Sequence, residues 1–154
     1  MEKVLILGSS GLLGRSLFEK LKSDNIKLFH NGLNKRKINL CNKTLLRKLI
    51  YSIEPSLIIN TSGATNIENC EKNKKLSNKI NYELIKEIFE LKKIKKLKFN
   101  LIHISTDQMY NLKKGRKSYE NSKLFLMNTY CKQKRMAEKI CLKNKALVFR
   151  TNFF

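Results

Sequence analysis

The sequence predicts an α/β fold in which a doubly wound parallel sheet lies between helices, in three αβα layers. Three observations predict it: short apolar runs alternate with longer amphipathic runs, the single proline, Pro55, barely interrupts this alternation, and three of the six glycines cluster after the first apolar run. The length of 154 residues fits one domain with one core, and no second domain is expected within it.

The predicted strands are short apolar runs, and helical patterns follow them. The first strand covers residues 4–7, and leucines recur behind it at helical spacing from Leu12 to Leu21. The loop between residues 104 and 130 is longer than a compact domain normally contains, and such loops often carry function. The other strands are expected over residues 26–29, 57–59, 99–104 and 146–149, and the other helices over residues 44–53, 76–96 and 130–142.

Composition narrows the class of protein. An apolar fraction of 42% excludes a disordered or collagen-like chain. No apolar run approaches the ~20 residues that cross a bilayer, and the first residues lack a secretion signal, so we expect a cytoplasmic protein with no membrane partner. Neither a CxxC pair nor a histidine cluster occurs, which indicates reduced thiols and no metal site. The cysteines are Cys41, Cys70, Cys131 and Cys141.

The net charge of +21 has two interpretations. Lysines are spread along the whole chain with no basic arm or tail, which favours a solvated surface of biased composition. The same charge would attract an anionic ligand. Nucleic acid is a less favoured partner, because no recognition motif accompanies the lysines.

The first chemical signal is the GxxGxxG spacing of Gly8, Gly11 and Gly14, where the first strand meets the first helix. Glycine permits the tight turn and removes the Cβ that would keep a pyrophosphate from the backbone, while the helix N-terminus offers free N–H groups and partial positive charge. A dinucleotide site is the natural interpretation. The alternative is a plain strand-to-helix turn with a close packing contact at Gly14.

The residues after the second strand bear on the choice of dinucleotide. A carboxylate there would bind the adenosine ribose hydroxyls and repel a 2′-phosphate. None is present, and His30, Asn31 and Asn34 lead instead into the basic residues 35–37. Pairing of these residues with a 2′-phosphate favours NADPH over NADH, although a solvated basic turn explains them equally well.

The second signal joins the end of the fourth strand to the helix after the long loop. Tyr130 and Lys134 share a helical face, and an ammonium beside a phenol lowers its pKa from about 10. Such a tyrosine can exchange a proton with a carbonyl oxygen that the Thr106 hydroxyl would orient. The alternative is a surface pair on a lysine-rich helix. The same spacing to a lysine also occurs, away from this sheet edge, at Tyr82, Tyr110 and Tyr119.

Five segments together resemble a known family. They are GSSGLLG at 8–14, NTSGAT at 60–65, STDQMY at 105–110, NTYCKQKRMAE at 128–138 and FRTNFF at 149–154. In order and spacing they resemble the extended short-chain dehydrogenase/reductases, and most closely the dTDP-4-dehydrorhamnose reductase group and its sugar-nucleotide-modifying relatives. The resemblance implies a Rossmann-like fold, with residues 1–154 as the NAD(P)-binding domain.

The resemblance also implies roles for individual residues. Hydride would pass from NADPH, or NADH, to a keto group of a nucleotide-linked sugar, with Tyr130 giving the proton and Lys134 binding the nicotinamide ribose. Thr106 completes the catalytic set. The substrate would meet Thr106, Asp107 and Phe153. The cofactor would contact Gly8, Ser10, Gly11, Leu12, Leu13, Gly14, Asn31, Asn39, Leu40, Ser62, Gly63, Ala64 and Thr65, in addition to Tyr130 and Lys134.

The chain departs from the family pattern at several points. Asn39 replaces a usual aspartate, Gly63 a usual alanine and Phe153 a usual tryptophan. Family members also continue for a comparable number of residues, and that half forms most of the sugar-nucleotide pocket. We therefore expect a fragment, or a chain whose site a partner such as a second copy in a homodimer completes. A non-catalytic dinucleotide-binding subunit is the alternative function, and a basic nucleic-acid-binding protein is the second alternative.

Overall fold

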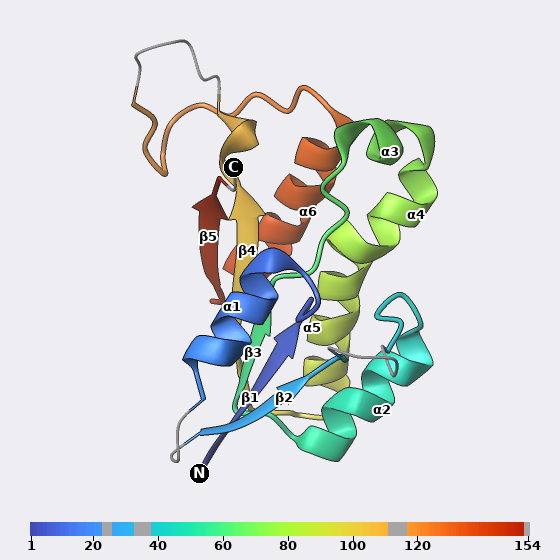
Figure 1. Ribbon diagram of the computed structural model, residues 1–154. Coiled ribbons are helices and arrows are strands. Elements are labelled where there is room, and N and C mark those ends of the chain that lie inside the picture. The colour runs from blue at the N-terminus through green and yellow to red at the C-terminus, as the bar shows by residue number, and fades with distance from the viewer. Residues whose placement is uncertain (23–25, 33–37, 111–116, 153–154) are drawn as a thin grey trace.

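The computed structural model describes residues 1–22, 26–32, 38–110 and 117–152, and these contain one sheet of five strands (Figure 1). Across the sheet the order is β2-β1-β3-β4-β5, and every pairing is parallel. The predicted parallel α/β fold is confirmed. In chain order the strands are β1 (Glu2–Leu7), β2 (Ile26–His30), β3 (Leu57–Asn60), β4 (Asn100–Thr106) and β5 (Leu147–Thr151).

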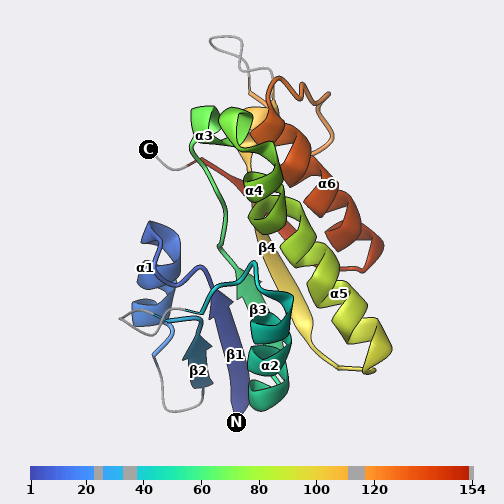
Figure 2. The same cartoon turned by 90° about the vertical axis from the view of Figure 1, so that its right-hand side faces the viewer.

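Helices lie on both faces of the sheet, but one face carries most of them. α1 (Leu12–Lys20) lies on one face, whereas α2 (Lys43–Ile53), α5 (Leu84–Ile94) and α6 (Thr129–Lys143) lie on the opposite face (Figures 1 and 2). β2 and β3 flank β1, so the strand order reverses at β1. At such a reversal the carboxyl ends of the strands form a crevice, which is where open α/β sheets bind their ligands.

Alternation along the strands divides the apolar side chains between two cores. Leu5 and Leu7 of β1 point toward α2, α5 and α6, whereas Val4 and Ile6 point toward α1. Both sides of β1 are therefore buried, as expected for a central strand of a parallel sheet. The helices contribute Leu46, Ile50, Ile53, Leu84, Ile85, Ile88, Ala137 and Cys141 to the larger core.

The face that carries α1 is bare over β5. Val148 packs into the larger core, so its neighbours Leu147 and Phe149 point to the α1 side, where they are 61% and 50% exposed. Figure 1 shows α1 in front of the sheet, and its side chains Leu17 and Phe18 pack with the strand β1. The side chains of Leu147 and Phe149 are therefore only partly covered by the described residues.

The single helix predicted over residues 76–96 is wrong in its start and in its continuity. The structure has α3 (Ile67–Lys72) and α4 (Lys74–Asn78), then a π-helical turn over Lys79–Glu83, and only then α5. The wider turn directs Asn81 into the interior, where it is 1% exposed. Asn66 caps α3 by accepting a hydrogen bond from the N–H of Asn69 at 2.8 Å. Apolar periodicity reveals neither the cap nor the inserted turn.

The other predicted elements differ from the structure mainly at their ends. β1 starts earlier than predicted, and β4 and β5 each run further, to Thr106 and Thr151. The long segment after β4 opens with a 3₁₀ turn over Asp107–Met109. Over the ranges that the structure describes, no helix is both long enough and apolar enough to span a membrane.

Candidate active site

The turn between β1 and α1 requires glycine at both ends. Gly8 has a φ of +84°, and a Cβ there would lie 2.5 Å from the backbone nitrogen of Ser62. A Cβ on Gly14 would lie 2.7 Å from the Oγ1 of Thr61, and closer still to the carbonyl oxygen of Gly8. The first turn of α1 therefore packs directly against the chain that leaves β3.

Asn31, just after β2, supports this glycine turn. Its Oδ1 accepts hydrogen bonds from the N–H of Gly8 at 2.9 Å, from the N–H of Ser9 at 3.2 Å and from the Ser9 hydroxyl at 3.1 Å. Asn31 is only 2% exposed. The sequence predicted a cofactor contact for this residue, and in the structure its side-chain oxygen fixes the shape of the turn.

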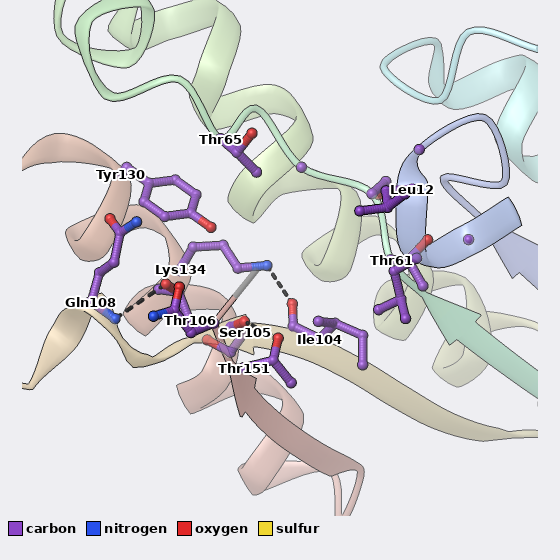
Figure 3. Close-up of a pocket in the computed structure, with 16 residues that line it drawn as sticks. Leu12, Thr61, Thr65, Ile104, Ser105, Thr106, Gln108, Tyr130, Lys134 and Thr151 are labelled. Carbon is purple, nitrogen blue, oxygen red and sulfur yellow. Dashed lines mark hydrogen bonds between the residues drawn. The ribbon is translucent and has the colours of Figure 1, made fainter. Parts of the chain in front are cut away.

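A cavity of about 300 Å³ opens at the carboxyl ends of β3, β4 and β5, beside the start of α1 (Figure 3). Among the predicted site residues, it brings together Gly11, Leu12, Leu13, Gly14, Ser62, Gly63, Thr65, Thr106, Tyr130 and Lys134. Its other lining residues follow or end the strands, and this position is the signal that could have found them. They are Thr61, Ile104, Ser105, Gln108, Thr151 and Asn152.

A second hollow, of about 430 Å³, adjoins the cavity at the glycine turn. Gly11, Thr61, Ser62 and Gly63 line both spaces. An extended ligand such as a dinucleotide can therefore lie in both, with its middle against the turn. The second hollow contains the predicted residues Gly8, Ser10, Asn31, Asn39 and Leu40, together with the unpredicted Ile38, Cys41 and Ile80.

Several residues of the predicted site are not brought into these two spaces. Ala64 lines neither, and its backbone bonds to the side chain of Asn81. Asp107 turns away from the cavity after β4 and lines a separate hollow with Tyr110 and Arg150. The structure therefore does not place Asp107 in the cavity with Thr106, where the sequence predicted it. Phe153, Asn34 and the basic residues 35–37 lie outside the described residues.

Tyr130 and Thr106 reach the cavity from different elements. Asn128 caps α6 by accepting a hydrogen bond from the N–H of Cys131 at 2.8 Å, which places Tyr130 in the first helical turn. Thr106 ends β4. Burial raises the pKa of Tyr130, and the Thr106 hydroxyl acts against that rise. The lowered pKa that the sequence predicted is wrong for this state, because Tyr130 is 6% exposed and the Lys134 amino group is directed elsewhere.

Lys134 lies one turn further along α6 and is 3% exposed. Its Nζ donates to the carbonyl oxygen of Ile104 at 2.6 Å, the bond drawn in Figure 3, and lies 3.3 Å from Nε2 of His103. Burial lowers the pKa of Lys134 to about 8. A group with that pKa gains or loses its proton near neutral pH, the range in which catalytic acids and bases work best.

The π-helical turn connects the two sides of the site. The side chain of Asn81 accepts from the N–H of Ala64 at 2.8 Å and donates to the Ala64 carbonyl at 3.1 Å. The same amide donates to Oε1 of Gln133 at 3.0 Å, between Tyr130 and Lys134 on α6. Asn81 therefore fixes the segment after β3 relative to α6. An asparagine inside an apolar helical pattern was the signal for it in the sequence.

These features define the class of fold. An open parallel sheet with a glycine turn at its reversal, and with hydroxyl, phenol and amine groups at the adjoining strand end, is an α/β domain of the Rossmann type. The described residues contain no group of three or more His, Cys, Asp or Glu side chains that could hold a metal ion. The family model described as the RmlD substrate binding domain matches residues 1–154, and the chain belongs to that family.

Known relatives are similar to the chain over about half their length. The spore coat polysaccharide biosynthesis protein SpsK of Bacillus subtilis (strain 168) is 27% identical over 140 residues, which cover 91% of this chain and 48% of SpsK. A dTDP-4-dehydrorhamnose reductase of Aggregatibacter actinomycetemcomitans is 27% identical over 157 residues, which cover 99% of this chain and 52% of that reductase. The structure of the Bacillus anthracis dTDP-4-dehydrorhamnose reductase in complex with NADP superposes with a TM-score of 0.83 at 23% identity. The superposition covers 97% of this chain and 52% of that structure.

Proposed function

We propose that this domain binds NADPH, with NADH as the alternative, and serves a reductase that acts on a keto group of a nucleotide-linked sugar. The observation that carries the proposal is the placement of Thr106, Tyr130 and Lys134 in the cavity that adjoins the glycine turn. The comparisons support the chemistry, since one relative is a dTDP-4-dehydrorhamnose reductase and one similar structure contains NADP.

The glycine turn fits a pyrophosphate. Gly11 caps α1 without a side-chain hydrogen bond, so the first N–H groups of this helix stay free for phosphate oxygens. Residues 8–14 would hold the pyrophosphate, Asn39 and Leu40 would lie beside the adenine, and residues 62–65 would flank the nicotinamide half. When bound, the nicotinamide supplies the hydride.

Tyr130 is suited to giving a proton in the direction of reduction. Because burial raises its pKa, the phenol holds its proton at neutral pH and can pass it to the oxygen of the ketone as hydride arrives at the carbon. Thr106 ends the adjoining strand, where its hydroxyl would hold the same oxygen. Lys134 would bind the nicotinamide ribose, and its pKa of about 8 suits it to return a proton to Tyr130.

The proposed pocket for the sugar nucleotide would include protein that packs on β5. The chain spans about half the length of its relatives, and Leu147 and Phe149 are exposed on the strand next to the cavity. We propose that protein covering β5 on this side completes the pocket, either as further residues of a longer chain or as a second copy.

Coenzyme binding is the first test of this proposal. NADPH added to the chain should bind saturably, measured by the change in coenzyme fluorescence, and Gly14→Ala should abolish binding because its Cβ would push the turn off Thr61. If neither NADPH nor NADH binds, the proposal fails.

Turnover is the second test, with the completing half of the protein present. Tyr130→Phe should bind NADPH normally but lose ketone-dependent NADPH oxidation. Tyr119→Phe is the matched control. Tyr119 also precedes a lysine by four residues, but it is 64% exposed and has no proposed role in the cavity. A Tyr130→Phe protein that retains full turnover would assign the proton to another group.

A non-catalytic dinucleotide-binding subunit is the second candidate. The direction of the Lys134 amino group favours it, since Nζ is bonded to the Ile104 carbonyl rather than to Tyr130. Such a subunit would bind NADPH equally well but show no turnover even with the completing half present. Tyr130→Phe would then change little.

A further inference from the structure

A series of buried hydrogen bonds runs beneath the cavity from Ser62 to Lys134. Ser62 donates to Oδ1 of Asn60 twice, through its backbone N–H at 3.2 Å and its hydroxyl at 2.5 Å. Nδ2 of Asn60 lies 3.1 Å from Nδ1 of His103, and Nε2 of His103 lies 3.3 Å from Nζ of Lys134. None of the four residues is more than 8% exposed. We call this series the Ser62–Lys134 relay.

The donors and acceptors of the relay are fixed at its Ser62 end. A backbone N–H can only donate, so the Asn60 atom that meets it is the oxygen, and the amide nitrogen faces His103. Because that nitrogen also can only donate, Nδ1 of His103 accepts and carries no proton. A neutral imidazole then carries its proton on Nε2, the ring nitrogen that faces Lys134.

This tautomer decides which form of Lys134 fits. An ammonium has no lone pair and cannot accept a hydrogen bond from Nε2–H, whereas a neutral amine accepts it and still donates to the Ile104 carbonyl at 2.6 Å. We propose that His103 is a positioning residue that favours the neutral amine form of Lys134 in the ligand-free protein, so that Lys134 binds a proton more readily once its Nζ leaves His103.

The ionisable groups around the relay agree with this assignment. Burial keeps the pKa of His103 well below 6.5, and a charged Lys134 would lower it further, so the imidazole is neutral near neutral pH. Burial also lowers the pKa of Lys134. On α6, Cys141 and Glu138 favour a charged Lys134, but burial raises the Cys141 pKa to about 12, and Glu138 is already paired with arginine.

In the described part of the neighbouring strands and turns, no further charged side chain acts on Lys134. β3 contributes the neutral Asn60, and β4 contributes His103 itself. Arg150 of β5 faces Glu138, and Asp107 of the turn after β4 acts on Tyr130 rather than on Lys134. His103 is therefore the neighbour that decides which form of Lys134, amine or ammonium, fits at this position.

The relay has a consequence for catalysis that rests on the proposed function. In the proposed reduction, Lys134 returns a proton to Tyr130, so the pH at which Lys134 becomes an ammonium limits that return. His103 would adjust this pH from a position that touches neither coenzyme nor substrate. The assignment of protons itself does not depend on the reaction.

The tautomer of His103 can be measured in the unaltered protein. The chain has two histidines, so the ¹⁵N NMR signals of the imidazole nitrogens are few, and His30→Gln leaves only those of His103. Near neutral pH we expect a protonated Nε2 and an unprotonated Nδ1. Protonation of Nδ1 would overturn the proposal, and this measurement needs no change in the relay.

Two substitutions then test the effect on Lys134. His103→Gln can turn its amide oxygen toward Nζ, and Asn60→Asp accepts from Nδ1 and so moves the ring proton away from Nε2. In each folded variant the midpoint of Lys134 titration, followed by NMR of labelled lysine, should rise by about one unit, a tenfold change in proton affinity. Lys134→Met identifies the signal, and His30→Gln should leave its midpoint unchanged.

An unshifted midpoint in folded His103→Gln would contradict the proposal. NADPH titration of the same samples reports separately on the proposed function. A protein with Nε2 protonated that binds no coenzyme would remove the function and retain the relay. A protein that binds coenzyme but has Nδ1 protonated would retain the proposed function and remove the relay.

Discussion

The side chains of Asn81 and Gln133 meet at 3.0 Å, although 52 residues separate them in the chain. Gln133 also donates to the Oγ of Ser77 at 2.9 Å, while Asn81 holds both backbone groups of Ala64. Because Gln133 stands between Tyr130 and Lys134 on α6, this amide pair joins the segment that would flank a cofactor to the helix that would act on a substrate.

Asn81→Ala should therefore reduce both stability and binding. The change leaves the N–H of Ala64 and the Oε1 of Gln133 without partners inside the protein, and the Ala64 carbonyl keeps only the Cys70 thiol, so we expect unfolding to become easier by about 2–3 kcal/mol. The measurement is urea denaturation alongside NADPH titration. Asn78→Ala is the matched control, since Asn78 has one partner, Glu83, at 2.9 Å, and should cost under about 0.5 kcal/mol. Equal losses in the two variants would contradict this role for Asn81.

Alanine should have opposite effects at Gly14 and Gly63. At Gly14 the new Cβ would collide with the Gly8 carbonyl and lie 2.7 Å from Thr61 Oγ1, so folding and coenzyme binding should both suffer. At Gly63 the nearest atom is Asn81 Oδ1 at 3.4 Å, an ordinary contact, and the backbone is outside the left-handed region. Gly63→Ala should stabilise the protein by about 0.4–1 kcal/mol, measured by thermal unfolding. A destabilised Gly63→Ala protein would show that the turn is tighter than this spacing indicates.

The strands and the glycine turn could be predicted because local chemistry determines them. Residues 4–7 of β1 form an unbroken apolar run, and Gly8 and Gly14 occupy positions where a Cβ meets other atoms, so the sequence carries their constraint directly. The approach of Tyr130 and Lys134 to the glycine turn also followed from topology, because parallel strands end at one edge.

Buried polar residues could not be predicted from the sequence in the same way. His103 and Asn60 look like ordinary members of strands, and their roles depend on the pairing of β3 with β4, which brings them face to face. The apolar spacing of residues 76–96 continues across the π-helical turn, so it does not show that this turn directs Asn81 into the interior. The pKa of Tyr130 was predicted in the wrong direction because burial depends on tertiary packing, which spacing does not report.

Glu138 and Arg150 provide a test of the contact between α6 and β5. Nε and Nη2 of Arg150 each donate to a carboxylate oxygen at 2.8 Å, and Arg135 adds a third bond at 2.8 Å. Glu138 is fully buried, so Glu138→Gln should cost about 3 kcal/mol by leaving Arg150 without its counter-charge. Glu90→Gln, at a half-buried residue 3.7 Å from Lys86, should cost under about 1 kcal/mol. Denaturant unfolding of both variants makes the comparison, and similar costs would contradict it.

The same ion pair predicts how stability depends on acid. Burial raises the pKa of Glu138, but its bonds to Arg150 and Arg135 outweigh burial and leave the pKa below the usual 4.5. A carboxyl group with a lowered pKa stabilises the folded state above the unfolded pKa and loses that contribution as pH falls through the folded value. Wild-type stability should therefore drop as pH decreases below about 4.5, and Glu138→Gln should lack part of that drop. Parallel curves for the two proteins would remove Glu138 as the cause.

Lys134 predicts a dependence of the opposite kind, at alkaline pH. Burial lowers its pKa from 10.5 to about 8, so between these values the unfolded chain binds a proton that the folded protein does not. Stability therefore rises with pH across this window, and the penalty for burying Lys134 is fully present below pH 8. Lys134→Met has no such group, so the stability of wild type relative to this variant should increase by on the order of 3 kcal/mol between pH 8 and pH 10.5, measured by urea denaturation at each pH. The contacts that the substitution removes shift the whole curve of stability against pH without changing its slope. A constant difference in stability between the two proteins from pH 8 to pH 10.5 would therefore mean that Lys134 stays an ammonium in the folded protein.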